Sequence, residues 1–128
     1  MSWSTPVMRV LIVEDEPVVA LEIEAIVLDR FPDAEIVLAA SVRDALQSIA
    51  AAPPGFALLD IDVTDGKTYA LALDLRLRSV PFVFVSGADR ADAPDGLERE
   101  RLVPKPFVPE AILRELDAFV GLAAKSAE

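Results

Sequence analysis

The sequence contains no cysteine and no histidine, and these two absences exclude several kinds of site. Without cysteine the chain can form no disulfide, no thiolate nucleophile and no cysteine-rich zinc site. Without histidine it has no Ser-His-Asp triad, no histidine metal ligand and no phosphohistidine. Any chemistry must therefore use carboxylates, hydroxyls, lysine, backbone groups or a bound ion.

Basic residues and long apolar runs are also scarce. The 128 residues include 12 Lys and Arg against 22 Asp and Glu, which gives a net charge of −10. This acidity argues against nucleic acid and anionic membranes as partners, because binding to either requires basic patches. No segment approaches the ~20 apolar residues that span a bilayer, and the N-terminus does not read as a signal peptide. We therefore expect a cytoplasmic protein.

The length and the hydrophobic content predict a single domain. Hydrophobic residues make up 53% of the chain, which is far more than an intrinsically disordered chain contains. We expect this domain to span residues 6–122, with loose termini at residues 1–5 and 123–128.

Short apolar runs without alternation indicate strands that are covered on both faces, as in a parallel sheet. Segments with helical signals separate these runs, so the chain is predicted to be an α/β protein with a doubly wound, five-stranded parallel sheet. The predicted strands are Val7–Val13, Glu35–Ala39, Phe56–Leu59, Pro81–Val85 and Arg101–Val103.

The predicted helices differ in how clearly the sequence marks them. Pro17 suits the first position of one helix, Ser41 is an N-cap for the next, and the last begins at Pro109 and ends at Gly121. Residues 69–77 alternate like a strand, but their composition and the need for a crossover favour a helix. Residues 89–100 contain Pro, Asp and Gly in sequence, which predicts a short or distorted helix.

Polar side chains follow four of the five predicted strands, where parallel strands present ligand sites. Taken singly, each has an ordinary structural role available, such as complementing a helix N-terminus or forming a turn. Their joint placement at one edge of the sheet points to a site. They are Glu14 and Asp15 after the first strand, Asp60 and Asp62 after the third, Ser86 after the fourth and Lys105 after the fifth.

These residue types suit phosphoryl transfer. Clustered carboxylates repel one another unless a hard cation such as Mg²⁺ neutralises them, and Mg²⁺ binds through one or two carboxylates together with phosphate oxygens. A lysine and a hydroxyl opposite would contact a phosphoryl group. Asp60 is a candidate nucleophile, because carboxylates form aspartyl phosphates.

With these residues in place, the sequence resembles the receiver domains of bacterial two-component response regulators. The segments that match are VLIVEDE, FALLDIDVTDG, PFVFVSG and KPF, and the resemblance covers about residues 7–122. It implies a flavodoxin-like fold with strand order 2-1-3-4-5. The sequence contains no output domain after the last helix, so we expect either a stand-alone receiver that signals through a partner or a receiver cut from a longer chain.

The resemblance also implies a role for each residue of the site. Asp60 would accept a phosphoryl group from a sensor histidine kinase, a histidine phosphotransfer protein or a small phosphodonor. Glu14, Asp15 and Asp60 would bind Mg²⁺, with Asp62 adding its backbone carbonyl. Lys105 would pair with the phosphoryl oxygens, and its bond to the next proline is cis in this family. Ser86 would be the hydroxyl that moves toward the phosphoryl group and shifts its strand.

Three departures from the family pattern concern the signalling surface. Leu102 stands where the family often has an aromatic residue, and Thr64 replaces a frequent proline. The segment between Ser86 and Lys105 is shorter than usual. We expect the phosphorylation chemistry to be kept and the output face to be unusual, with a downstream protein target that the sequence does not identify.

Other functions stay open. The residues Asp60 to Thr64 match the DxDx(T/V) motif of haloacid-dehalogenase-type phosphatases, although in that family the acidic pair follows the lysine. A phosphorylation-independent interaction module is the second alternative. A flavin site on the same fold is disfavoured, because no hydroxyl- or glycine-rich phosphate loop follows Val13.

Overall fold

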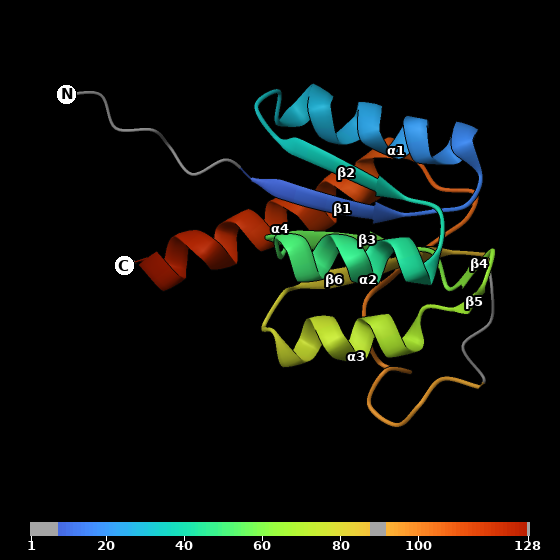
Figure 1. The fold of residues 1–128 in the computed structure, drawn as a ribbon. Helices are drawn as coiled ribbons and strands as arrows, with labels where there is room; N and C mark the ends of the chain where they lie inside the picture. The colour runs from blue at the N-terminus through green and yellow to red at the C-terminus, as the bar shows by residue number, and fades with distance from the viewer. Residues whose placement is uncertain (1–7, 88–91, 128) are drawn as a thin grey trace.

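The computed structural model describes the backbone of residues 8–87 and 92–127, and side chains as far as Val120. Its centre is a parallel sheet with strand order β2-β1-β3-β6-β7, flanked by helices (Figure 1). The sheet is formed by β1 (Arg9–Val13), β2 (Glu35–Ala39), β3 (Phe56–Leu59), β6 (Phe82–Ser86) and β7 (Leu102–Pro104). The helices are α1 (Pro17–Arg30), α2 (Val42–Ala51), α3 (Tyr69–Leu77) and α4 (Pro109–Ala127), and a small hairpin comprises β4 (Asp62–Val63) and β5 (Gly66–Lys67).

The predicted fold class and strand order are confirmed. The sheet order is the predicted 2-1-3-4-5 with the hairpin inserted, and every pairing in the sheet is parallel. The bounds of β2 and β3 match the prediction, whereas β6 and β7 each begin and end one residue later. Val7, the predicted start of the first strand, lies outside the described residues. Continuous apolar runs therefore located the buried strands correctly.

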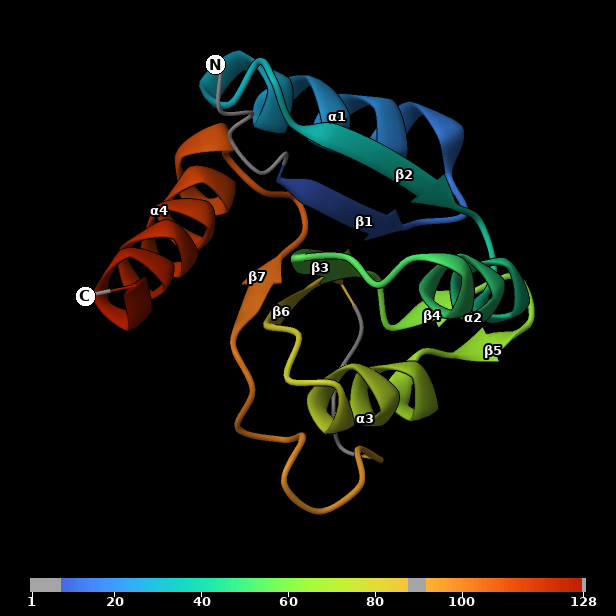
Figure 2. The ribbon, with the colours of Figure 1, turned by 60° about the vertical axis from the view of Figure 1, so that its left-hand side comes forward.

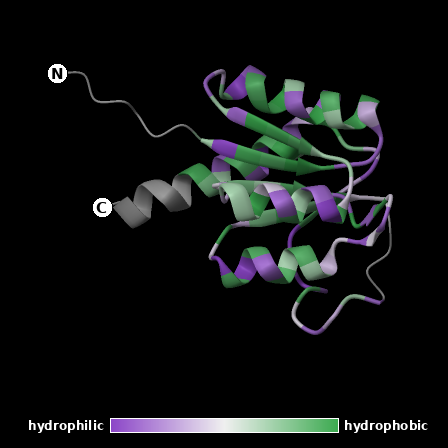
Figure 3. Ribbon diagram, viewed as in Figure 1, coloured by the Kyte–Doolittle hydropathy of each residue, from purple (hydrophilic) through white to green (hydrophobic). Residues whose placement is uncertain are grey.

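Helices cover both faces of the sheet and create two cores. Helices α1 and α4 lie on one face, and α2 and α3 lie on the other (Figure 2). Alternate residues of each strand enter opposite cores: Leu11 packs with α2 and α3, whereas Ile12 packs with α1 and α4. Burial on both faces explains the hydrophobic strands at the centre of the molecule (Figure 3).

The third crossover is a helix, as predicted from composition and not from its alternating pattern. The buried positions of α3 have helical spacing, and they are Tyr69, Leu71, Ala72 and Leu75. Leu77, which an alternating strand would bury on the same face, is 86% exposed. At α2 the predicted cap is present, because the Ser41 hydroxyl accepts a hydrogen bond from the Asp44 amide at 3.0 Å.

The last helix is longer than predicted. It starts at Pro109 as expected, but it continues past Gly121 to Ala127, so the predicted end at Gly121 is wrong. Glycine ends a helix when it adopts a left-handed conformation. Within a helix it costs only about 1 kcal/mol, and the alanines and leucine that follow are strong helix formers. None of the helices in the described part of the chain is long and apolar enough to cross a membrane.

The fourth crossover contains turns where a short or distorted helix was predicted. Within its described part, residues 92–101, the backbone forms consecutive turns and no helix. Gly96 has a φ of +92°, which interrupts a helix, and Pro94 accepts a turn hydrogen bond from the amide of Leu97 at 3.0 Å. The Leu97 side chain is completely buried in the core beside α3. Leu97, together with the partly buried Ala93, packs the segment against this core.

The β4–β5 hairpin fixes the loop that follows β3. Its turn residue Asp65 accepts hydrogen bonds from the first two amides of α2, Val42 at 2.8 Å and Arg43 at 3.1 Å. These two bonds lower the pKa of Asp65, because they stabilise the charged carboxylate. The hairpin is thereby tied to the α2 N-terminus at the carboxyl edge of the sheet.

Candidate phosphoryl-transfer site

The parallel pairing of the strands places Glu14, Asp60, Ser86 and Lys105 at one edge of the sheet. Glu14, Asp60 and Lys105 each lie just past the end of a strand, and their amides extend the pairing with the neighbouring strand by one bond, whereas Ser86 is the last residue of β6. The Asp60 amide donates to Val13 O at 2.9 Å, the Glu14 amide donates to Ala39 O at 2.9 Å, and the Lys105 amide donates to Ser86 O at 3.2 Å. Parallel pairing therefore aligns four strand ends that are distant in the sequence.

Asp60 is at the centre of this edge. Its side chain is largely buried, and each of its carboxylate oxygens accepts a bond from a different strand end. The Ser86 hydroxyl donates to Oδ1 at 2.8 Å, and Lys105 Nζ donates to Oδ2 at 3.1 Å. Lys105 also forms an ion pair with Glu14. The sequence prediction that these four side chains meet is correct in geometry, and their roles stay predictions.

Three carboxylates could hold a metal ion here. One oxygen from each of Glu14, Asp15 and Asp60 lies within 4.8 Å of the others. Such a set of hard oxygen donors fits Mg²⁺, which keeps several waters and takes few protein ligands. A hollow of about 280 Å³ lined by Glu14, Asp15 and neighbouring residues of α1 and β2 adjoins the carboxylates. The residues present therefore fit the predicted cation.

Burial and pairing set the charges of the site. Burial raises the pKa of Glu14, partly offset by its hydrogen bonds with Lys105 and the Glu16 amide. For Lys105, burial favours the neutral amine, but hydrogen bonds with Glu14 and Asp60 outweigh it and raise the pKa of the ammonium. Lys105 is therefore positively charged throughout the physiological pH range.

Asp62 lies apart from the carboxylate group. Its side chain is 54% exposed and forms an ion pair with Lys67 across the β4–β5 hairpin, with 2.6 Å between Asp62 Oδ1 and Lys67 Nζ. It is not among the three carboxylates that cluster. A contribution through its backbone carbonyl, as the resemblance implies, stays a prediction.

The loop after β7 has the conformation that the resemblance implies. The peptide bond between Lys105 and Pro106 is cis. Gly87, next to Ser86, lies close to this loop, because a β-carbon on it would be 3.8 Å from the Lys105 Cβ. Leu102, at the position where the family often has an aromatic residue, is half-buried beside the α3 core.

Thr68 is a site-supporting residue that the sequence did not single out. It is completely buried, its hydroxyl donates to the backbone carbonyl of Asp60 at 2.6 Å, and its amide donates to Ile61 O at 2.9 Å. Both bonds close the loop that carries Asp60. The only signal in the sequence is its place before α3, which reads equally well as an ordinary helix cap.

Thr68→Val is expected to destabilise the protein by about 1–3 kcal/mol, because it keeps the shape but leaves the buried Asp60 carbonyl without its donor. Urea unfolding measures this loss. Thr64→Val, in the exposed hairpin turn, is the matched control and should leave the midpoint nearly unchanged. Equal midpoints for the two variants would contradict a supporting role for Thr68.

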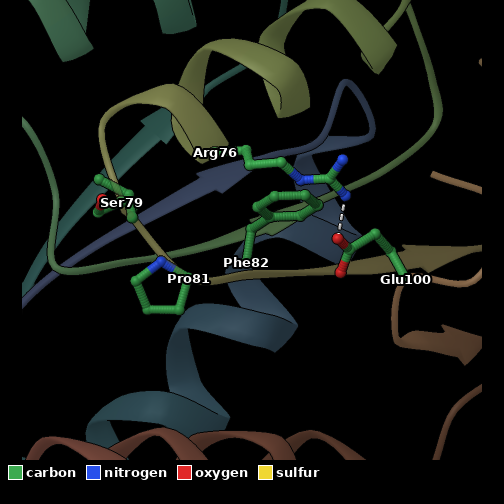
Figure 4. A pocket seen from close by; sticks show the side chains of 6 residues that line it. Arg76, Ser79, Pro81, Phe82 and Glu100 are labelled. Atoms are coloured by element: carbon green, nitrogen blue, oxygen red, sulfur yellow. Dashed lines mark hydrogen bonds and ion pairs between the residues drawn. The ribbon is translucent and has the colours of Figure 1, made fainter. Parts of the chain in front are cut away.

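A second hollow lies at the opposite end of β6. It has a volume of about 320 Å³ and is lined by residues at the end of α3 and the start of β6, with Glu100. Figure 4 shows the Phe82 ring among the lining side chains and the ion pair between Arg76 and Glu100 next to it. Because Ser86 ends the same strand, this hollow is separated from the Asp60 site by the length of β6.

Comparisons with known proteins agree with this picture at the level of structure. No protein-family model matches the chain, and no curated protein does. Among solved structures, the receiver domain of the PhyR response regulator from Erythrobacter litoralis is 28% identical, with a TM-score of 0.77 over 89% of this chain and 90% of that chain. PhyR from Brucella abortus is 29% identical, with a TM-score of 0.73 over 95% of this chain and 52% of that chain.

A CheY-like receiver domain from Methanospirillum hungatei shares the fold at lower identity. It is 21% identical, with a TM-score of 0.79 over 94% of this chain and 99% of that chain. The family resemblance indicated by the sequence motifs is therefore confirmed in three dimensions, and the chain has the structure of a response-regulator receiver domain.

Proposed function

We propose that the protein is a phosphoacceptor in a two-component phosphorelay, phosphorylated on Asp60 in a Mg²⁺-dependent reaction. The observation that carries this proposal is the set of contacts around Asp60: one carboxylate oxygen bonded to Ser86, the other to Lys105, and Glu14 and Asp15 beside it. The structural neighbours are response regulators, which supports a signalling domain.

The residues divide the reaction among them. One Asp60 oxygen attacks the phosphorus of the donor, the bond from phosphorus to the leaving group breaks, and the leaving group takes the electron pair. The Lys105 ammonium and the Ser86 hydroxyl, which contact Asp60, would bond the oxygens of the transferred group. Glu14, Asp15 and Asp60 would hold Mg²⁺, whose positive charge would offset the charge of the phosphate.

The donor and the output belong to the same proposal. A sensor histidine kinase or a histidine phosphotransfer protein would supply the phosphoryl group, since the chain has no histidine of its own. Phosphorylation would then change the binding of a downstream protein. The cytoplasm is the proposed location for this exchange.

The proposal differs from the phosphatase alternative in stoichiometry. With Mg²⁺ and a small acyl phosphate, the intact mass should increase by one phosphoryl group per chain. A phosphomonoester should not be turned over repeatedly, because Asp62, the general acid/base of the phosphatase motif, is paired with Lys67. Sustained release of phosphate from a phosphomonoester would instead favour the phosphatase.

Mg²⁺ is expected to raise the melting temperature of the protein, and Asp15→Asn should remove most of that increase. A ligand at a hundred times its Kd stabilises the folded state by about 2.7 kcal/mol, and Asp15 supplies one of the three clustered carboxylates. Thermal melts across a Mg²⁺ titration measure the effect. Asp33→Asn, an exposed acid between α1 and β2, should keep the full increase. Equal increases in both variants would contradict the assigned metal site.

A further inference from the structure

Tyr69, the only tyrosine of the chain, lies between the Asp60 site and the β6–β7 connection. It is the first residue of α3 and is 7% exposed. Its ring meets the edge of the Phe84 ring with 6.1 Å between centroids and 84° between planes. Phe84 is completely buried and precedes Ser86 by two positions in β6, so both lie on the same face of that strand. The ring of Tyr69 is thus in contact with β6, the strand that ends at Ser86, whose hydroxyl bonds to Asp60.

The hydroxyl of Tyr69 contacts the segment that connects β6 to β7. It donates to Asp92 Oδ1 at 3.2 Å, and Asp92 belongs to the segment of turns that leads to β7. Lys67 Nζ lies 3.9 Å from Asp92 Oδ2, and it also forms the ion pair with Asp62. Burial and the nearby Asp92 raise the pKa of Tyr69, so its hydroxyl keeps its proton as a donor.

β7 (Leu102–Pro104) contains no aromatic residue that could make a similar contact with Phe84. Leu102 lies opposite Phe84 in the β6–β7 register and is half-buried in the same core. The turns of residues 92–101 have no helical backbone to hold them. Their described contacts with α3 and its core include the Leu97 side chain, the bond from Tyr69 to Asp92, and the bonds of Arg76 with the Gly96 carbonyl and with Glu100.

Phosphorylation of Asp60 would disturb this arrangement from the Ser86 end. The Ser86 hydroxyl bonds to a carboxylate oxygen that would then lie beside a bulky, charged phosphoryl group. A shift of Ser86 would move the end of β6 and with it Phe84, two residues earlier in the same strand. We propose that Tyr69 is a positioning residue that passes this shift to the β6–β7 connection through its ring contact with Phe84 and its hydroxyl bond to Asp92. This inference rests on the proposed function.

Tyr69→Phe tests the inference, because it keeps the ring and removes only the bond to Asp92. The probe is beryllofluoride with Mg²⁺, a phosphoryl mimic, and the readout is amide hydrogen exchange of residues 92–101. In the wild-type protein the mimic should change exchange in this segment. In Tyr69→Phe the change should be about fivefold smaller, which corresponds to the loss of one net hydrogen bond. Asp92→Ala should behave like Tyr69→Phe, and Asp95→Ala, in the same segment, should behave like wild type.

The NMR signal of Tyr69 itself shows whether this residue responds to the mimic or only packs in the core. Fluorotyrosine incorporated into the whole protein gives one ¹⁹F resonance, because Tyr69 is the only tyrosine. We expect this resonance to move when the mimic is added, and to move less in Asp92→Ala. Acyl phosphate should still add one phosphoryl group to Tyr69→Phe.

Two outcomes would overturn the inference in distinguishable ways. If wild type accepts a phosphoryl group but Tyr69→Phe shows an undiminished exchange response, the positioning role of Tyr69 is wrong and the proposed function stands. If wild type neither accepts a phosphoryl group nor responds to beryllofluoride, the proposed function is wrong, and so is the positioning role of Tyr69.

Discussion

Lys105→Ala is expected to destabilise the Mg²⁺-free protein by about 3 kcal/mol at neutral pH. Lys105 is paired with two carboxylates whose side chains are only 1% exposed (Glu14) and 11% exposed (Asp60). Removing one partner of a buried ion pair leaves uncompensated charge, which typically costs 3–5 kcal/mol. The Lys105 side chain is 20% exposed, so we place the cost at the lower end of that range. Urea unfolding in the presence of a chelator measures it.

The same variant should show a characteristic pH dependence. The pKa of Glu14 is raised by burial even with Lys105 present, and without Lys105 it should be raised further. A carboxyl group whose folded pKa is raised contributes stability below its ordinary value of 4.5, and this stability is lost as the pH rises through the folded pKa. The deficit of Lys105→Ala should therefore be small in acid and grow toward neutral pH.

Two further variants identify the source of the deficit. Glu14→Gln combined with Lys105→Ala should recover part of the lost stability, because it removes one of the two unpaired charges. Lys67→Ala removes an exposed ion pair, which water and salt screen, so it should change the stability far less than Lys105→Ala does. A deficit in Lys105→Ala that is the same at every pH would contradict this account of the site.

Leu97→Ala is expected to cost about 2–4 kcal/mol, although the residue belongs to a segment of turns. The side chain is completely buried in the core with α3 and the sheet, and truncation of a buried leucine leaves a cavity. Leu77→Ala is the matched control, because its side chain is 86% exposed and its loss should change stability by less than ~0.5 kcal/mol. Chemical denaturation compares the two. A Leu97→Ala protein as stable as the control would mean that the connection does not cover the sheet.

The sheet and the core of the site could be predicted because both depend on short-range signals. Apolar runs such as Phe56–Leu59 are buried on both faces, so they carry no alternation and stand out in the sequence. Parallel pairing then places the residue after each run at one edge, which is how Asp60, Ser86 and Lys105 could be grouped before their contacts were known.

The contacts that support the site depend on distant parts of the chain, and the sequence did not show them. The β4–β5 hairpin is two residues per strand, too short for a periodic signal, and its Asp65 acts as a cap for a helix more than twenty residues earlier. Thr68 is typical of a helix start, and its bond to the Asp60 carbonyl appears only once the loop is closed.

Two predictions about helices were wrong, and their physical causes differ. Gly121 was read as a stop, yet the helix continues because the residues after it favour helix and nothing there requires a left-handed backbone. In residues 89–100 a short or distorted helix was expected, but in the described part of this segment Gly96 at a positive φ and the burial of Leu97 stabilise turns. Local propensity was decisive in the first case, and tertiary packing in the second.

Phosphoryl transfer to Asp60 is tested most directly by intact mass after incubation with Mg²⁺ and an acyl phosphate. Wild type should gain one phosphoryl group, Asp60→Asn should gain none, and a chelator should abolish the gain in wild type. Asp62→Asn is the matched control, because this neighbouring acid is exposed and paired with Lys67, and it should still be phosphorylated. A wild-type protein that gains no phosphoryl group from any donor, including histidine kinases, or an Asp60→Asn protein that gains one, would contradict the assignment.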